Sequence, residues 1–401
     1  MVRDINYKSE QRLLHLLFFA FGFVSMAWYP RFPEVKANLQ LNNGAFGSLM
    51  STGSIGAFFG LLTVGHIIHR FGAVKVTITS ILILATSLGF LVHITTSFLF
   101  LVFNIAFGFG FIAVYVCINS QAFHYLERSG RNLVTSAAGY WSAGALVTAI
   151  VSGLLVGHVS LVKHIDILCL VAGILMIFIV LHLRPVLLTP NKDSESDYSI
   201  KEIFTSFRID WPVSLGAACA FYLEYAAGDW GTIFTKERLN IDAGLSTVPY
   251  IVFTAAIIFG RLLIHRLLPF APLHLWVKRA ALLAGIGFGT CITVATHLPV
   301  AYKWWSYGLF IFAFFFAGLG SSFLGPTFFA AANSRSKLPS AVVVGQFGFV
   351  NNVLLFGIKW IVAWTIQLTG SIALAMMIPA LVMLSTVFFI DALKHGSKAE
   401  D

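Results

Sequence analysis

Two carboxylates interrupt a stretch of apolar and small residues between positions 210 and 233, and these acids are the strongest candidates for chemistry. Glu224 and Asp229 lie five residues apart, so on an α-helix they point about 140° away from each other. A carboxylate inside hydrocarbon costs roughly 3 kcal/mol or more, so each one needs a reason to be there. A carboxyl group that alternates between dry and water-filled surroundings can bind and release a proton. Glu224 and Asp229 are therefore the candidate proton-coupling residues.

Each acid also has a structural alternative. Glu224, which we expect to face a central cavity, could instead hydrogen-bond to a neighbouring helix. For Asp229, anchoring at a helix end beside Trp230, with a basic partner such as Arg238, is the preferred interpretation. Lys359 also lies in an apolar stretch, and we expect its side chain to snorkel to the outer membrane interface.

Amide and aromatic side chains inside long apolar stretches form a second set of candidates. Amides both donate and accept hydrogen bonds, so they suit a solute that carries hydroxyl groups, and an indole can stack on a sugar ring. Hydrogen bonding between helices, or simple packing, is the alternative for each of them. The candidate substrate-cavity residues are Trp28, Asn119, Gln121, Trp141, Tyr222, Gln346, Asn351 and Asn352.

The composition excludes an ordinary water-soluble protein. Of the 401 residues, 58% are hydrophobic and 11% are charged, whereas soluble domains carry about 25% charged residues. The net charge of +9 is scattered between apolar runs, which disfavours a nucleic-acid partner. The four cysteines form no Cys-x-x-Cys pair, so we expect no metal and no cofactor. The expected surroundings are a lipid bilayer, and the expected form is a monomer.

Apolar runs of about 20 residues predict an all-α polytopic membrane protein with twelve transmembrane helices. A polar break divides them into an N-terminal six-helix bundle (1–185), a cytoplasmic linker (186–208) and a C-terminal six-helix bundle (209–401). The first run is too long for a signal-peptide core. The predicted spans are 13–30, 44–68, 73–93, 97–123, 133–157, 164–184, 210–233, 243–265, 274–296, 301–331, 339–366 and 371–393.

The distribution of basic residues predicts the orientation. If the N-terminus is cytoplasmic, most of the 26 Lys and Arg residues fall in cytoplasmic segments, and this bias alternates loop by loop. We therefore expect both termini in the cytoplasm and the chain in a cell membrane, with a bacterial inner membrane as the expected compartment.

Similar glycine patterns recur in the two halves, which indicates an internal duplication. Gly65 and Gly260 each begin a segment that ends in His-Arg, and a Gly-x-Gly pair at Gly108 recurs at Gly318. Because the pair at Gly108 lacks the rest of a dinucleotide fingerprint, close helix packing is its preferred interpretation.

The segment GHIIHRFGAVK, residues 65–75, resembles the loop motif between the second and third spans of the major facilitator superfamily. His69 stands where the family usually has Asp, and Ala73 and Val74 stand where basic residues are common. The resemblance implies either a weaker inward-closed gate or one that responds to pH, and a weaker gate is the preferred interpretation. The candidate gating residues are Gly65, His69, Arg70 and Gly72, and in the second half Gly260, Arg261 and His265.

Further stretches, including residues 28–33, 140–144 and 224–230, resemble the bacterial branch of fucose and sugar permease-related, YbjJ-type proteins. The resemblance implies two pseudo-symmetric six-helix bundles and a secondary transporter that moves a small polar or amphipathic solute, for example a sugar, by alternating access coupled to protons. Drug or metabolite efflux, and a transport-inactive receptor or sensor, are the alternatives. The sequence has no Walker, His-Glu-x-x-His or Gly-x-Ser-x-Gly motif, so we expect no enzyme.

Overall fold

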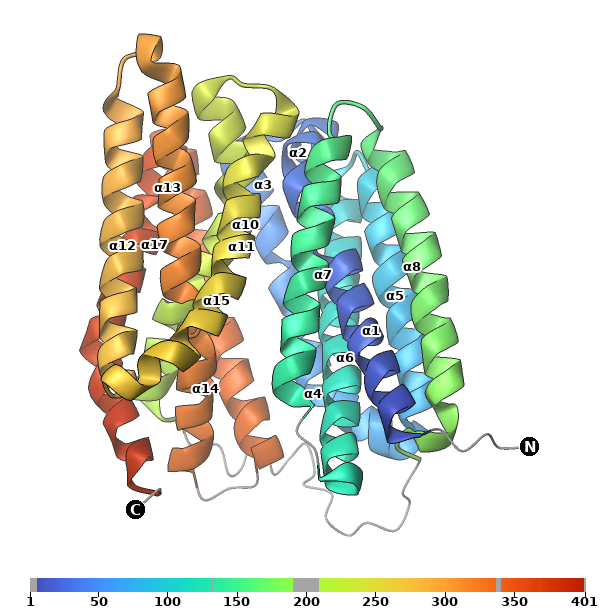
Figure 1. Cartoon of the computed structure of the whole chain (residues 1–401). Helices are drawn as coiled ribbons and strands as arrows, with labels where there is room; N and C mark the ends of the chain where they lie inside the picture. Colours follow the sequence, from blue (N-terminus) through green and yellow to red (C-terminus); the bar gives the residue numbers. More distant parts are fainter. Residues whose placement is uncertain (1–5, 131–132, 190–208, 337–339, 400–401) are drawn as a thin grey trace. The chain divides into compact units, whose positions relative to one another are not determined.

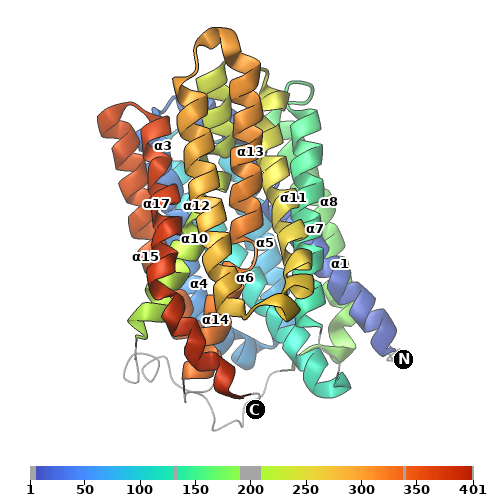
Figure 2. The ribbon, with the colours of Figure 1, turned by 60° about the vertical axis from the view of Figure 1, so that its left-hand side comes forward.

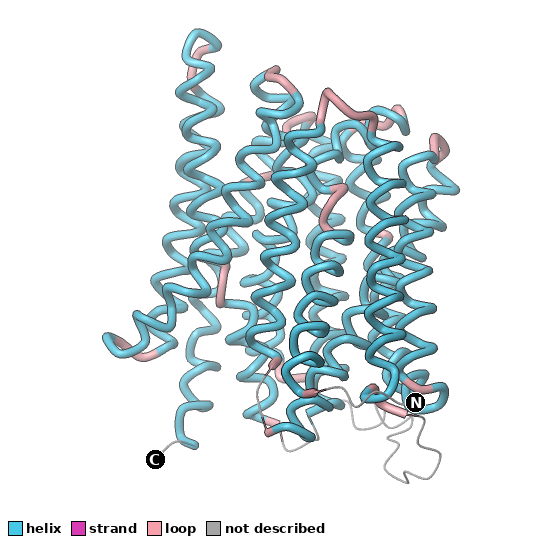
Figure 3. The backbone as a smooth tube through the Cα atoms, turned by 45° about the vertical axis from the view of Figure 1, so that its right-hand side comes forward, coloured by secondary structure: helices cyan, strands magenta, loops and turns pink. Residues whose placement is uncertain are grey.

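The computed structural model describes residues 6–130, 133–189, 209–336 and 340–399. These residues form helices and loops and include no strand (Figures 1 and 3). Within them, eleven stretches are long and apolar enough to cross a membrane. The prediction of an all-α polytopic membrane protein is confirmed. The predicted linker, 186–208, lies mostly outside the described residues, and the predicted boundaries at 185 and 209 remain a prediction.

The first of two compact units comprises Met1–Trp28 and Thr52–Lys201. Within it α1 packs against α7 and α8, α6 against α4 and α5, and α5 against α8. The helices of this unit are α1 (Tyr7–Ser25), α4 (Gly53–Phe71), α5 (Ala73–His93), α6 (Ser97–Ser129), α7 (Val134–Leu155), α8 (Leu161–Leu183) and the short η2 (Arg184–Val186).

The second unit comprises Tyr29–Ser51 and Glu202–Asp401. Its longer helices are α10 (Trp211–Leu239), α11 (Ala243–Leu267), α12 (Leu273–His297), α13 (Lys303–Ser321), α14 (Leu324–Arg335) and α15 (Ser340–Thr369). The short helices are η1 (Tyr29–Arg31), α2 (Phe32–Leu39), α3 (Asn43–Ser51), η3 (Leu268–Phe270), η4 (Val300–Tyr302), α16 (Ile372–Ala375), α17 (Met377–Ser385) and η5 (Thr386–Ala399). Within this unit α12 and α13 run side by side, α3 packs on α15, and α10 contacts α11, α14, α15 and α17 (Figures 1 and 2).

Helix α10 corresponds to the seventh predicted span, 210–233, although it is not among the eleven apolar stretches. Its 29 residues give a length of about 44 Å, enough to cross a bilayer with its headgroups. Glu224 and Asp229 lower its hydropathy, and several of its other residues are small. The least apolar span is therefore the one that contains the candidate proton-coupling acids.

The Gly-x-Gly pair of α6 brings this helix close to two neighbours. A methyl group at Gly108 would overlap the carbonyl oxygen of Gly53 on α4. One at Gly110 would lie 2.8 Å from the backbone nitrogen of Leu84 on α5. Only glycine permits backbones to approach this closely, so the pair holds α6 between α4 and α5.

The corresponding pair of α13 plays the same part in the second unit. A methyl group at Gly318 would overlap the carbonyl oxygen of Phe253 on α11, and one at Gly320 would lie 3.0 Å from the backbone nitrogen of Ala284 on α12. Both pairs thus place one helix between two others at matching places in the chain order. The packing interpretation of these glycines is confirmed, and the match supports the internal duplication.

Candidate functional site

The candidate proton-coupling acids lie on α10, whose ends are set by local signals. The Asp210 side chain accepts a hydrogen bond from the backbone nitrogen of Val213, 3.4 Å away, and caps the first turn. Asn240 ends the helix in a left-handed conformation with φ of 45°. At 1.5 Å per residue, Glu224 lies about 20 Å and Asp229 about 27 Å beyond Trp211. Both acids therefore lie inside the span rather than at its start.

Asp229 forms an ion pair with Lys359 of α15. Lys359 Nζ lies 2.7 Å from Asp229 Oδ2, and the two side chains are only 14% and 10% exposed. The ammonium group also lies 4.8 Å from the ring centroid of Tyr225, a cation–π distance. The expectation that Lys359 snorkels to the interface is therefore wrong, because a buried acid offers it a stronger partner. Arg238 donates instead to the carbonyl oxygen of Thr296.

A small pocket adjoins this ion pair. Within the second unit, α3 packs against α10 so closely that a methyl group at Gly47 would meet the Trp230 ring. The side chains that line the pocket come from α3, α10 and α15. They are Phe46, Gly47, Met50, Asp229, Trp230 and Lys359.

Glu224 is half-buried and forms no hydrogen bond or ion pair with any residue that the structure describes. Its charge acts at longer range on Tyr29, Tyr250 and Arg261. The rings of Tyr29 and Tyr250 stack, with centroids 6.1 Å apart and an interplanar angle of 8°. Glu224 thus acts electrostatically on two tyrosines and one arginine, and no described cation is in direct contact with it.

The amides of α15 lie at a depth similar to that of Glu224. Asn351 is about 17 Å from the start of α15 at Ser340. Its Oδ1 atom is buried and accepts no hydrogen bond from the described residues. Gln346 is buried and Asn352 is half-buried on the same helix. A buried amide oxygen with no protein donor is a suitable acceptor for water or a solute.

Tyr222 was expected in the substrate cavity, but its side chain is 1% exposed. Its hydroxyl donates to the carbonyl oxygen of Ile358, 3.4 Å away on α15. This contact joins α10 to α15 and favours the packing alternative for Tyr222.

The two indoles of the first unit differ. Trp28 is 1% exposed and packs edge-on against Phe107 at a centroid distance of 4.9 Å, which favours packing. Trp141 is half-buried on α7, and its Nε1 atom is buried and donates to none of the described residues. Of the two indoles, Trp141 is the better candidate for contact with a solute.

The two polar candidates on α6 both bind backbone carbonyl or amide groups. Asn119 Nδ2 donates to the carbonyl oxygen of Tyr115, 2.8 Å away on its own helix. Gln121 is buried, and its Oε1 accepts a hydrogen bond from the backbone nitrogen of Leu188 at 3.0 Å. Gln121 therefore ties α6 to the segment after α8, which favours the structural alternative for this residue.

A family model described as the Major Facilitator Superfamily matches residues 14–358. The chain belongs to the major facilitator superfamily. It is 24% identical over 344 residues to an uncharacterised MFS-type transporter of Yersinia pestis, with 84% of each chain covered. The fold is similar to that of a D-xylose-proton symporter (TM-score 0.71, 13% identity, 96% and 97% of the two chains covered). It is also similar to that of the E. coli fucose:proton symporter FucP (TM-score 0.64, 18% identity, 98% and 100% covered).

The superfamily loop motif joins α4 to α5 in this member. Gly72 has a φ of 82°, a conformation that favours glycine, and it ends one helix and starts the next. His69 and Arg70 are exposed, and the Arg70 guanidinium lies 5.3 Å from the ring centroid of Phe71. His69 forms no ion pair with a described residue. A methyl group at Gly65 would meet nothing within 4 Å.

The motif of the second half of this superfamily member has different contacts. A methyl group at Gly260 would overlap the Ser322 side chain, and Arg261 Nε donates to the carbonyl oxygen of Ser322 at 2.9 Å. The side chain of His265 lies outside the described residues. Gly260 and Gly65 therefore occupy matching places in the sequence, but only Gly260 is needed for close packing.

Sequence reasoning missed the aromatic and basic partners of the two acids. Tyr29 and Tyr225 enter the sequence analysis only as parts of stretches that resemble a family, and Tyr250 is not singled out there. Lys359 is expected at the interface, although a basic residue in one span and an acid at a similar depth in another are a signal for an ion pair.

Proposed function

We propose that this chain is a secondary transporter that moves a small hydroxyl-bearing solute by alternating access and couples that movement to protons through Glu224. The observation that supports it is a half-buried carboxylate inside α10, a helix long enough to cross a bilayer, with no hydrogen bond or ion pair among the described residues. A structural carboxyl group would be expected to have such a partner, because an unpaired buried charge is expensive. A group that must bind and release a proton needs this freedom.

Asp229 differs from Glu224 because Lys359 already balances its charge. We therefore assign proton uptake and release to Glu224. In this proposal Asp229, the second candidate acid, holds α10 to α15 beside the site, so that Glu224 keeps its position when the solute binds.

The proposed substrate class is supported by polar atoms that have no hydrogen-bond partner among the described residues. Asn351 Oδ1 can accept a hydrogen bond and Trp141 Nε1 can donate one. Hydroxyl groups both donate and accept hydrogen bonds, so a solute such as a sugar or a polyol could bond to either atom. The symporters of similar fold are named for D-xylose and fucose, which agrees with that class.

The test uses purified protein in proteoliposomes with a panel of labelled solutes, D-xylose, L-fucose and uridine first. Wild-type protein should accumulate one of them when a proton gradient is imposed. Glu224→Gln should lose gradient-driven accumulation yet keep exchange of labelled for unlabelled solute, which needs no net proton movement. Glu127→Gln is the matched control, because Glu127 is an exposed acid near the end of α6.

Two outcomes would overturn the proposal. Gradient-driven accumulation retained by Glu224→Gln would remove the coupling role of this residue. No movement of any solute by wild-type protein, together with saturable binding of one, would instead favour a transport-inactive receptor. The exposed His69, which has no ion pair among the described residues, is the observation that favours this second candidate.

A further inference from the structure

A cavity of about 430 Å³ opens beside the first turns of α1, within the first compact unit. The α1 residues that line it recur every three or four positions, so they share one face of the helix. The remaining wall comes from α7, which packs along α1 (Figure 1). The lining residues are Lys8, Gln11, Arg12, His15 and Tyr140. Two of these residues are basic and none is acidic.

The inner wall of this cavity is formed by side chains that contact one another. His15 is only 9% exposed, and its ring stacks on Tyr140 with centroids 4.2 Å apart and an interplanar angle of 12°. His15 Nε2 lies 2.8 Å from the hydroxyl of Ser136, which fixes the orientation of the ring. The cavity is therefore built from α1 and α7 together and is not a gap left by one flexible side chain.

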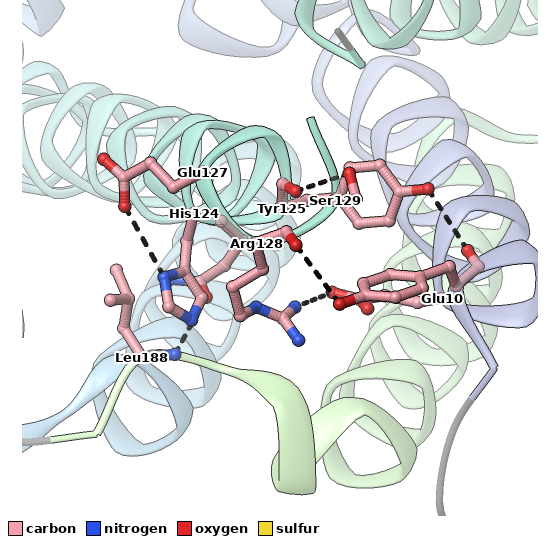
Figure 4. Close-up of polar contacts among 9 residues, drawn as sticks. Glu10, His124, Tyr125, Glu127, Arg128, Ser129 and Leu188 are labelled. Atoms are coloured by element: carbon pink, nitrogen blue, oxygen red, sulfur yellow. Dashed lines mark hydrogen bonds and ion pairs between the residues drawn. The ribbon is translucent and has the colours of Figure 1, made fainter. Parts of the chain in front are cut away.

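The two cations of the cavity have no counter-ion among the residues that the structure describes. Lys8 and Arg12 are exposed and form no ion pair with any described residue. The acid between them in sequence, Glu10, points the other way, because it is 2% exposed and pairs with Arg128 of α6 (Figure 4). Like charges four residues apart on a helix repel each other, so an anion between Lys8 and Arg12 would relieve that repulsion.

We propose that this cavity binds a phosphate-bearing anion. A guanidinium and an ammonium group, four residues apart on one helix face, suit the several oxygen atoms of a phosphate better than a single carboxylate. The apolar part of α1 begins at Leu13, directly after Arg12, so the cavity lies at the depth of lipid headgroups. Both an acidic phospholipid headgroup and a soluble phosphate compound present this chemistry, and the proposal does not depend on transport.

The test measures binding of phosphatidylglycerol to the full chain by native mass spectrometry, from micelles that also contain phosphatidylcholine. Lys8→Gln combined with Arg12→Gln should weaken phosphatidylglycerol binding by about 25-fold, about fivefold for each charge. The matched control combines Arg184→Gln with Lys278→Gln. These two residues are also one Arg and one Lys, exposed near helix ends, and they lie outside the cavity.

Equal weakening in both double variants would overturn the proposal, because binding would then follow net charge alone. Unchanged binding in the Lys8 and Arg12 variant would overturn it as well. A second arm adds inorganic phosphate. Displacement of phosphatidylglycerol from wild-type protein identifies a site that also takes soluble phosphate, and selective binding without displacement identifies a lipid site. An unchanged thermal transition in phosphatidylcholine verifies that each variant is folded.

Discussion

The ion pair between Asp229 and Lys359 leads to a specific prediction about the free energy of unfolding. At 2.7 Å and an effective dielectric constant of about 20, the attraction is about 6 kcal/mol, most of which offsets the cost of removing both groups from water. Replacing Lys359 by Met leaves a buried carboxylate without its partner and should lower the free energy of unfolding by about 3–5 kcal/mol. Combining Lys359→Met with Asp229→Asn removes both charges, so the double variant should lose only about 1–2 kcal/mol.

The assay is reversible unfolding of purified protein by sodium dodecyl sulfate in mixed micelles, followed by tryptophan fluorescence. The double variant should be more stable than either single variant. Lys163→Met is the control, because Lys163 is exposed near the start of α8, and its effect should stay within about 0.5 kcal/mol. A double variant no more stable than Lys359→Met would refute the reasoning, since the two charges would then be uncoupled.

Two pairs of glycine substitutions extend the same assay. Gly108→Ala should cost about 1–3 kcal/mol, because its methyl group would push α6 away from α4, whereas Gly139→Ala, with no atom within 4 Å of the added methyl group, should cost little. Gly72→Ala should cost about 1–2 kcal/mol because its φ of 82° strains any residue with a Cβ atom, whereas Gly65→Ala should be neutral or slightly stabilising. Equal effects within either pair would contradict the packing or backbone argument concerned.

The spans and the glycine pairs could be predicted from the sequence because both follow from local physics. A helix surrounded by lipid must be apolar over about 20 residues, and a helix that approaches its neighbours closely needs residues without bulk. The short Gly-x-Gly patterns at Gly108 and Gly318 are therefore enough to predict close helix packing.

The partners of the polar residues could not be predicted in the same way. A helix that is apolar all round gives no sign of which face meets a cavity, so Tyr222 and Gln121 had no local feature to separate packing from solute contact. The pairing of Asp229 with Lys359 joins helices that are distant in sequence, and only the three-dimensional arrangement decides it. Similar depth in two spans narrows the choice of partner without fixing it.

The contact between α10 and α15 also has a consequence for biogenesis. The ribosome completes α10 before it reaches Lys359, and at ordinary elongation rates the delay is on the order of ten seconds. During that interval Asp229 has no cation from α15 to balance it, and α10 is not among the eleven stretches that are apolar enough to cross a membrane by composition alone. We expect α10 to wait beside the translocon until α15 emerges, so that the second half of the chain enters the bilayer as a group of helices.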